Sequence, residues 1–385
     1  MHIQPHLSDF LNPALTDTAA SFDPQLPLSA KDSILPPGIV LLEGGGMRLN
    51  FFAGPGVSTV CARVGGVECA LTQGENGVYS AEFGSGEGGF CPVAFFVDGA
   101  EVLNPLAPIG FGWSHPINYA DIPQENADFL MLQDVPHGAV TQEYYYSKAA
   151  GNWKSCLVYT PPGYMKDSHA EYPVLYLQHG HGENEQCWVH QGRTNFILDN
   201  LIALGEAVPF LVVMNNGMVQ RSEHGIRTLD TALIEPLLIE DCIPFIERTY
   251  RAKQGKWHRA MAGLSMGSMQ TSVVTLNHPD LFGYVGIFSG FVRPLPFLMD
   301  DDSHLAALED RDAFRRNFRL FFRACGDHDD LALQHFEGDS ALLAQKGLAP
   351  SECPSHEEIR YPGGHEWNVW RLCLRDFARK IFHDT

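Results

Sequence analysis

The sequence feature that most constrains this chain is a Gly-x-Ser-x-Gly match at residues 263–267, centred on Ser265. Residues 257–262 before it are short and mostly apolar, which predicts a strand. Residues 268–277 after it contain no glycine or proline, which predicts a helix. A strand that turns sharply into a helix strains its turn residue, and the flanking glycines remove Cβ atoms that would clash there. The Ser265 hydroxyl should therefore project at the carboxyl end of a sheet, beside a helix amino end that favours negative charge.

The motif alone is weak evidence, because a chain with 37 glycines can match it by chance. Two later segments strengthen it. The apolar residues 320–324 run into Cys325 and Gly326 and then into Asp327, Asp329 and Asp330, and acidic residues just past a strand's carboxyl end lie on the same rim as the Ser265 turn. His365 follows on a glycine-rich loop. The order Ser, Asp, His is the one that α/β-hydrolases use.

Each of these side chains has a predicted task. His365 takes the proton from Ser265 and later returns it to the leaving group, while an aspartate orients the imidazole and stabilises its charged form. The spacing leaves Asp327, Asp329 and Asp330 all open for that aspartate. Asp330 is also expected to cap a helix that begins near Leu331.

Acyl transfer also requires an oxyanion hole, for which two backbone N–H groups are expected. One is that of Met266, just after the nucleophile, and the other is that of His181, in the glycine-containing loop after the strand predicted at residues 172–178. An alternative interpretation is a metal site made of His179, His181 and Glu183. No further ligand cluster with metal spacing follows, so neither a metal nor a cofactor is expected.

The pattern of the chain predicts two domains with a connection between them. The expected parts are an extended segment at residues 1–37, a small β-sandwich at 38–103, a linker at 104–135 and an α/β domain at 136–385. In the sandwich, strands are expected at 47–52, 57–64, 78–83 and 93–97, with Asn76-Gly77 and Asp98-Gly99 as hairpin turns. The linker carries Trp113, His115 and Tyr119, for which packing between domains is favoured over a position above the active site.

The α/β domain alternates apolar strands with helix-length segments. Strands are expected at 154–159, 172–178, 210–214, 257–262, 284–288 and 320–324, and helices at 193–204, 231–250, 268–277 and 367–382. Near-continuous apolar strands separated by helices indicate a mostly parallel sheet covered on both faces, and the predicted fold class is an α/β-hydrolase sheet preceded by an all-β domain.

Composition narrows the possible partners. The formal charge of −20 argues against binding to nucleic acid or an anionic membrane surface. The sequence contains no uninterrupted stretch of about 18 apolar residues, so no membrane span is expected. Met1–His6 lack the basic region and the apolar core of a secretory signal, so none is expected. The nine cysteines are scattered without metal or redox spacing, which predicts reduced, buried or half-buried thiols and a cytoplasmic location. A homo-oligomer remains open.

Several segments together resemble the esterase D/feruloyl esterase-like family. They are residues 135–138, 159–164, 179–180, 263–267, 325–326 and 364–367, and the part before them looks like the early-set, immunoglobulin-like domain that precedes many catalytic domains of this family. The family includes feruloyl and acetyl-xylan esterases, enterochelin esterases and mycolyl transferases. Its members place the acid four residues after the cysteine of the Cys-Gly motif, which implies Asp329 here. The absence of a signal peptide favours small imported esters over polymer-bound ones.

These features predict a serine esterase that acts on small aromatic or sugar esters, with hydroxycinnamates such as ferulate as the acyl group that the resemblance implies. A siderophore lactone is the alternative substrate, and an inactive glycan-binding protein is the alternative class, although an intact triad argues against it. Four residues on loops near the rim are candidates for the acyl pocket, and core packing explains each of them equally well: Trp188, Asn216, Met218 and Trp367.

Overall fold

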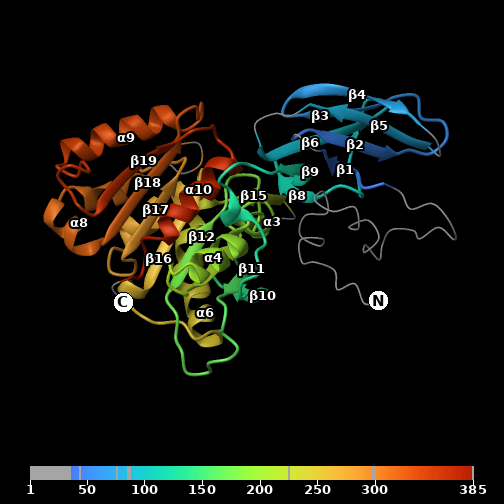
Figure 1. Cartoon of the computed structure of the whole chain (residues 1–385). Helices are drawn as coiled ribbons and strands as arrows, with labels where there is room; N and C mark the ends of the chain where they lie inside the picture. Colours follow the sequence, from blue (N-terminus) through green and yellow to red (C-terminus); the bar gives the residue numbers. More distant parts are fainter. Residues whose placement is uncertain are drawn as a thin grey trace. The chain divides into compact units, whose positions relative to one another are not determined.

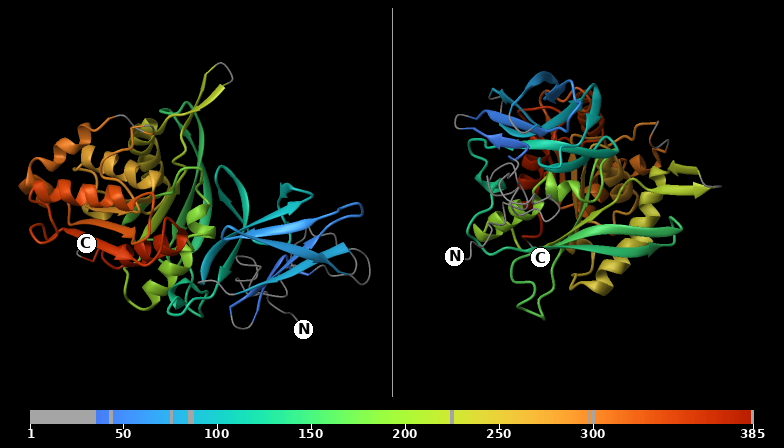
Figure 2. Two further views of the ribbon diagram at one scale, coloured as in Figure 1. Left: turned by 90° about the horizontal axis from the view of Figure 1, so that it is seen from above. Right: turned by 90° about the vertical axis from the view of Figure 1, so that its right-hand side faces the viewer.

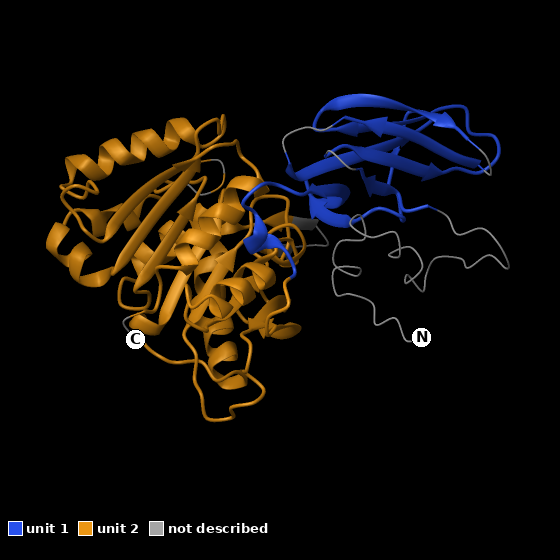
Figure 3. Cartoon of the chain, in the orientation of Figure 1, with its two compact units in different colours: residues 1–132 blue, residues 133–385 orange. Residues whose placement is uncertain are grey.

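The computed structural model describes residues 36–42, 45–74, 77–84, 88–223, 226–296, 298 and 301–383. The extended segment expected at residues 1–37 lies outside the described residues up to residue 35, and so does Asn76 of the first expected hairpin turn. The chain divides into two compact units, residues 1–132 and 133–385 (Figure 3).

The amino-terminal unit is built from antiparallel strands. They are β1 (Ile39–Leu41), β2 (Met47–Phe52), β3 (Val60–Val64), β4 (Val67–Gln73), β5 (Val78–Phe83), β6 (Gly89–Val97), β7 (Ala100–Val102), β8 (Ile109–Gly112) and β9 (His115–Ile122). They pair in the order β1-β2-β5-β4-β3-β6-β9-β8, with β7 also on β6. Buried side chains such as Leu49, Ala62 and Phe95 form its core. Asp98 and Gly99, with φ of 47° and 84°, make the predicted turn between β6 and β7.

The segment expected to be a linker contains the hairpin β8–β9, so the boundary at residue 103 is wrong. β9 pairs with β6 over Gly89↔Ile122 to Val93↔Asn118, which makes it part of the sheet. Pro108 and Pro116 hide the alternating pattern of the hairpin in the sequence, because proline is rare inside paired strands. Tyr119 is buried and its ring lies 5.0 Å from that of Phe90, inside this unit.

The carboxyl-terminal unit holds an eight-stranded sheet in the order β10-β11-β13-β12-β16-β17-β18-β19. Its strands are β10 (Ala139–Ser147), β11 (Asn152–Thr160), β12 (Val174–Gln178), β13 (Leu211–Asn215), β16 (Arg259–Leu264), β17 (Tyr284–Phe288), β18 (Leu320–Gly326) and β19 (His356–Tyr361). From β13 to β19 all neighbours are parallel, while β10 and β11 form an antiparallel edge (Figures 1 and 2). A separate hairpin joins β14 (Gln220–Glu223) to β15 (Ile226–Leu229).

Helices cover both faces of this sheet. On one face lie α3 (Cys187–His190), α4 (Thr194–Ala203) and α10 (Trp367–Ala378), and Phe288 and Phe322 each meet Phe377 of α10 at 5.8 Å. The other face carries α5 (Ile234–Pro236), the π-helix η5 (Leu237–Cys242), α6 (Ile243–Thr249), α7 (Met266–Asn277), α8 (Arg311–Asn317) and α9 (Leu333–Gln345). None of the helices in the described part of the chain has the length and apolarity that a membrane crossing requires.

The helix expected at residues 231–250 is helical without a gap from Thr231 to Thr249, but its hydrogen-bond type changes along its length. It consists of the 3₁₀ turn η4 (Thr231–Leu233) followed by α5, η5 and α6. Pro236 and Pro244 lie within this stretch, and because proline has no N–H, the regular hydrogen-bond pattern cannot pass through either position. The other predicted strands and helices of this unit agree with the structure within a few residues, whereas the strands β10, β14, β15 and β19 and the helices α3 and α8 were not predicted.

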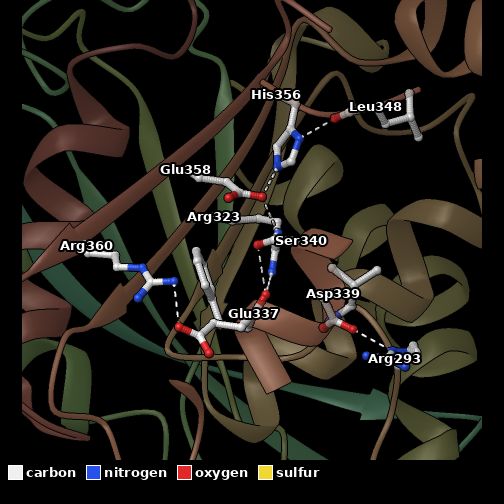
Figure 4. Close-up of polar contacts among 11 residues, drawn as sticks. Arg293, Arg323, Glu337, Asp339, Ser340, Leu348, His356, Glu358 and Arg360 are labelled. Carbon is white, nitrogen blue, oxygen red and sulfur yellow. Dashed lines mark hydrogen bonds and ion pairs between the residues drawn. The ribbon is translucent and has the colours of Figure 1, made fainter. Parts of the chain in front are cut away.

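A buried arginine anchors β18 to its neighbours. The Arg323 guanidinium has no exposed surface and donates to Glu358 Oε1 of β19 at 2.6 Å, to Ser340 Oγ of α9 at 3.1 Å and to the Phe336 carbonyl at 2.8 Å (Figure 4). His356 Nε2 lies 3.3 Å from the same Glu358 oxygen. This network fixes the strand whose carboxyl end leads into the loop of Asp329.

Candidate active site

Ser265 occupies a strained turn between β16 and α7, with φ of 51° and ψ of −119°. The flanking glycines are required by close contacts: a Cβ on Gly263 would lie 2.3 Å from the Gly267 carbonyl oxygen, and a Cβ on Gly267 would lie 2.5 Å from that of His179. The Ser265 N–H donates to the Phe288 carbonyl at 3.0 Å, which ties the turn to β17. These contacts hold the half-buried serine at the rim of the sheet, as the motif predicted.

Three side chains form a continuous hydrogen-bond chain at this rim. His365 Nε2 lies 3.0 Å from Ser265 Oγ, and His365 Nδ1 lies 2.9 Å and 3.0 Å from the two carboxylate oxygens of Asp329. An ionised carboxylate only accepts hydrogen bonds, so Nδ1 carries the proton and Nε2 is left to accept the serine O–H. The rings of His365 and Trp370 also meet edge to face, with their centroids 5.2 Å apart.

Asp329 is fully buried, yet its surroundings favour the charged form. Burial acts to raise the pKa of Asp329, but hydrogen bonding and charge from His365, with the N–H of Ala332, outweigh it and leave the pKa below its usual value. Its Oδ1 accepts the N–H groups of Ala332 at 2.8 Å and of Leu331 at 3.2 Å. Asp329 therefore carries a negative charge at neutral pH, facing the imidazole.

The two neighbouring aspartates lie elsewhere. Asp327 is exposed and accepts from His328 Nδ1 at 2.6 Å and from the Gly363 N–H at 3.0 Å, so it links the loop after β18 to the loop of His365. Asp330 is also exposed. The expectation that Asp330 caps a helix is wrong, because α9 begins at Leu333 without a side-chain cap, and the amides of the preceding turn point to Asp329 instead.

The loop after β12 approaches the serine closely. A Cβ on Gly180 would lie in van der Waals contact with Ser265 Cβ, at 3.5 Å, and only 2.8 Å from Leu264 Cδ1. The Gly180 N–H donates to Glu183 Oε2 at 2.8 Å, and the Gly180 carbonyl accepts from the Glu183 N–H at 3.3 Å. Burial raises the pKa of Glu183 to about 7. The Gly180 N–H is therefore occupied, and His181 is the next residue of this loop.

His179 is buried beside this loop with both ring nitrogens engaged. Its Nδ1–H donates to the Gly180 carbonyl at 2.8 Å, and its Nε2 accepts the N–H of Gly217 at 3.0 Å. Burial lowers the pKa of His179 to about 4, which keeps the ring neutral at pH 7. Neither nitrogen is left for a metal ion, and in the part of the chain that the structure describes no three His, Cys, Asp or Glu side chains gather as ligands.

Two of the four expected pocket residues are packing residues. Trp188 has no exposed surface, donates its Nε1–H to the Gln178 carbonyl at 2.9 Å and meets Trp367 edge to face at 5.1 Å. Trp367 is buried as well. Trp188 and Trp367 are 0% and 3% exposed and present almost no surface to a bound molecule, so the expectation that they line an acyl pocket is wrong.

Asn216 and Met218 lie half-buried on the loop after β13, near the rim. Asn216 Nδ2 donates to Glu185 Oε2 at 2.7 Å, and its Oδ1 accepts the Met218 N–H at 3.0 Å. Met218 packs against a cluster that includes Met266, the residue after the nucleophile. Sequence reasoning missed the buried Glu185, which also accepts from Ser155 Oγ. Nothing in the local sequence around Glu185 indicates that its carboxylate is buried and accepts hydrogen bonds from two other segments.

Comparison with known proteins finds esterases among the similar sequences and structures. The family model described as "Putative esterase" matches residues 147–381. The chain is 34% identical over 321 residues to an endo-1,4-beta-xylanase/feruloyl esterase of Xylanibacter ruminicola, covering 81% of this chain and 41% of that protein. It is 31% identical over 270 residues to endo-1,4-beta-xylanase Y of Acetivibrio thermocellus, covering 64% and 23% respectively. The chain thus spans less than half the length of each of these two relatives.

Two solved structures share the fold. A ferulic acid esterase of Anaeromyces mucronatus superposes with a TM-score of 0.56 at 23% identity, over 66% of this chain and 94% of that one. An enterobactin esterase of Shigella flexneri gives a TM-score of 0.60 at 14% identity, over 89% and 94%. At these identities the likeness establishes the α/β-hydrolase fold of the carboxyl-terminal unit. Because the family model covers most of this unit and more than half of the whole chain, the protein belongs to this esterase family.

Proposed function

We propose that this chain is a serine carboxylic ester hydrolase that works through an acyl-enzyme. The observation that carries the proposal is the chain of hydrogen bonds from Asp329 through His365 to Ser265, with the serine held in a strained turn at the start of α7. A serine whose hydroxyl is bonded to an oriented, neutral imidazole is the arrangement that activates this residue as a nucleophile.

In the proposed reaction, His365 Nε2 removes the Ser265 proton as Oγ attacks the ester carbonyl. The negative charge that develops on the carbonyl oxygen is stabilised by the N–H of Met266 and that of His181. The imidazolium, held by the ionised Asp329, then gives its proton to the departing alcohol. Water, activated by the same imidazole, attacks the acyl-enzyme, and the acid leaves as Ser265 regains its proton.

We further propose that the acyl group is aromatic, of the hydroxycinnamoyl type. Support comes from the relative named as a feruloyl esterase, which aligns with 81% of this chain. Met218 and Asn216 supply a half-buried surface beside the serine turn, with the thioether as an apolar contact and the amide as a polar one. A siderophore lactone is the second candidate, because the enterobactin esterase superposes over 89% of this chain, which includes part of the amino-terminal unit. We also infer that this unit is the early-set-like sandwich implied by the sequence.

The test combines labelling with a substrate panel. A fluorophosphonate probe should label the parent protein and not the Ser265→Ala variant, whose hydrolysis of any substrate should fall by about 10⁴-fold or more. Methyl hydroxycinnamates, acetylated sugars and a siderophore lactone then separate the substrate classes. Absence of labelling in the parent, with hydrolysis of none of these esters, would instead support a hydrolase fold that only binds its ligand.

A further inference from the structure

Three exposed aromatic side chains line one face of the edge hairpin β10–β11. Tyr144 and Tyr146 of β10 and Trp153 of β11 are 61%, 52% and 69% exposed, and we call them the aromatic strip. Residues two apart on a strand point to the same side, and Tyr146 pairs directly with Trp153 across the hairpin. The two rings meet edge to face at 5.8 Å. Large neighbouring aromatic rings left in water often mark a binding surface.

The strip is uncharged. The strands of the hairpin contain two charged residues, Glu143 and Lys154, and the alternation of side chains directs both to the opposite face. There Glu143 accepts a hydrogen bond from the Tyr250 hydroxyl at 2.6 Å. The strand side chains beside the strip on its own face, such as Gln142 and Ser155, are neutral and polar, and the carboxylate that Ser155 contacts, Glu185, is buried. A protein with a formal charge of −20 thus presents here a neutral surface of rings and hydroxyl groups.

Contacts on the opposite face hold the hairpin in place. Asp241 Oδ2 accepts the Ser147 hydroxyl at 2.7 Å and the Ala149 N–H at 3.1 Å, which fixes the turn between the strands. The hydroxyl of Tyr145, between the two exposed tyrosines, donates to Asn215 Oδ1 at 2.8 Å. The rings are therefore arranged before any ligand arrives, which lowers the entropy lost on binding.

The strip reaches the rim of the sheet that carries Ser265. β11 runs antiparallel to β13 with Cys156 opposite Asn215, so residues 152–155 extend past the carboxyl end of β13. Ser155, on the same face as Trp153, donates to Glu185, which in turn binds Asn216 of the proposed pocket. Three strand spacings separate β11 from β16, which is about 14 Å.

We propose that the aromatic strip binds the neutral carbohydrate part of an ester substrate, a few sugar units from the acyl group at Ser265. The proposal rests on the esterase function proposed above and identifies the alcohol side of its substrate as an oligosaccharide. The apolar C–H face of a pyranose stacks on an aromatic ring, while tyrosine hydroxyls and the indole N–H can bond sugar hydroxyls. An uncharged ligand matches an uncharged strip, and the distance to Ser265 suits an oligosaccharide that continues from the ester.

The first experiment compares two esters of one acid, methyl ferulate and a feruloylated xylo-oligosaccharide. In Trp153→Ala and Tyr146→Ala, KM for the oligosaccharide ester should rise about 10-fold with kcat near that of the parent, and Trp153→Tyr should restore part of the loss. Both constants for methyl ferulate should stay unchanged. Equal losses on both esters, or no loss on the oligosaccharide ester, would overturn the proposal.

The matched control is Trp113→Ala, because Trp113 is also 69% exposed but lies in the amino-terminal unit, where it lines a hollow of about 860 Å³. This variant should behave as the parent with both esters. If Trp113→Ala weakens the reaction with the oligosaccharide ester and Trp153→Ala does not, the sugar site lies in the amino-terminal unit and the proposal is wrong.

A binding assay separates this inference from the esterase proposal. Unesterified xylan in a native gel should retard Ser265→Ala, and should retard the double variant Ser265→Ala/Trp153→Ala much less. That result supports the strip even if no ester is hydrolysed. Equal mobility of the two variants, whether or not they are retarded, counts against the strip, whereas persistent hydrolysis by Ser265→Ala counts only against the catalytic role of the serine.

Discussion

The Nε2 atom of His179 accepts the backbone N–H of Gly217 at 3.0 Å, so a buried, neutral histidine joins the loop after β12 to the loop after β13. The Gly217 carbonyl accepts from Gln270 Nε2 of α7 at 2.8 Å, which connects both loops to the helix that follows Ser265. The loop that carries His181 and the loop that carries Asn216 and Met218 thus share one support. Protonation of His179 would place a second hydrogen against the Gly217 N–H and break that support.

Stability should therefore fall on the acid side of neutrality. The folded protein holds the pKa of His179 at about 4, against about 6.5 in the unfolded chain, so the unfolded state takes up the proton first. The contribution of His179 is complete above pH 6.5 and is lost as the pH falls to 4, with an upper limit of about 3 kcal/mol. Melting temperatures of the parent and of His179→Gln, measured from pH 7 to pH 4, should converge as the pH falls. A constant difference between them would show that another group is responsible.

Glu183 should have the opposite pH dependence. Burial raises the pKa of Glu183 to about 7 from about 4.5, so the unfolded state loses its proton first as the pH rises. Its protonated form stabilises the fold fully below pH 4.5, and this contribution is lost by pH 7. Glu183→Gln keeps an oxygen that can accept the Gly180 N–H but cannot ionise. The melting temperature of Glu183→Gln, relative to that of the parent, should rise between pH 5 and pH 8. If the difference between the two melting temperatures stays constant over this range, Glu183 is not the group that titrates.

The aspartates after β18 differ in their expected effect on turnover. Asp329→Asn should lower kcat by about 10⁴-fold, because an amide favours the wrong tautomer of His365. The amide oxygen can still accept the N–H groups of Leu331 and Ala332, so the melting temperature should change little. Asp327→Asn and Asp330→Asn are the matched controls, since both carboxylates are exposed and neither bonds His365. Near-parent activity of Asp329→Asn, with inactivation by either control change, would reassign the acid.

The sequence could predict those parts of the site whose backbone geometry requires particular residues, such as glycine, at neighbouring positions. Ser265 lies between two glycines that leave no space for a Cβ, and His365 follows two more glycines, so short motifs locate both. Asp329 could not be separated from Asp327 and Asp330 by spacing, because the path of the turn after Gly326 decides which carboxylate faces inward. The resemblance to a family was needed to choose it.

The sequence could not predict which side chains near the site are buried by distant parts of the chain. Trp188 and Trp367 were expected on loops near the rim, but the two rings pack against each other although about 180 residues separate them in the sequence. No local sequence pattern indicates a contact of this kind. β19 was missed because its strand, His356–Tyr361, consists mostly of charged and polar residues at the sheet edge, where Glu358 pairs with the buried Arg323 instead of facing only solvent. The buried Glu185 gave no signal for the same reason, since its partners Ser155 and Asn216 come from other strands and loops.

The ion pair between Arg323 and Glu358 allows the contribution of one such distant contact to the stability of the fold to be measured. Arg323 is completely buried and Glu358 is 22% exposed, so Glu358→Ala leaves a buried guanidinium without its carboxylate and should lower the free energy of unfolding by about 3–5 kcal/mol. The control is Glu337→Ala, which removes the partner of Arg360 in a pair whose side chains are 47% and 54% exposed, at a cost of about 1 kcal/mol or less (Figure 4). Urea unfolding measures the free energy of unfolding of both variants.

The double variant Arg323→Met/Glu358→Ala should be more stable than Glu358→Ala alone, because it removes the unpaired charge as well. If the double variant is no more stable, the loss comes from packing between β18, β19 and α9, and the charge of Arg323 is compensated by Ser340 and the Phe336 carbonyl alone.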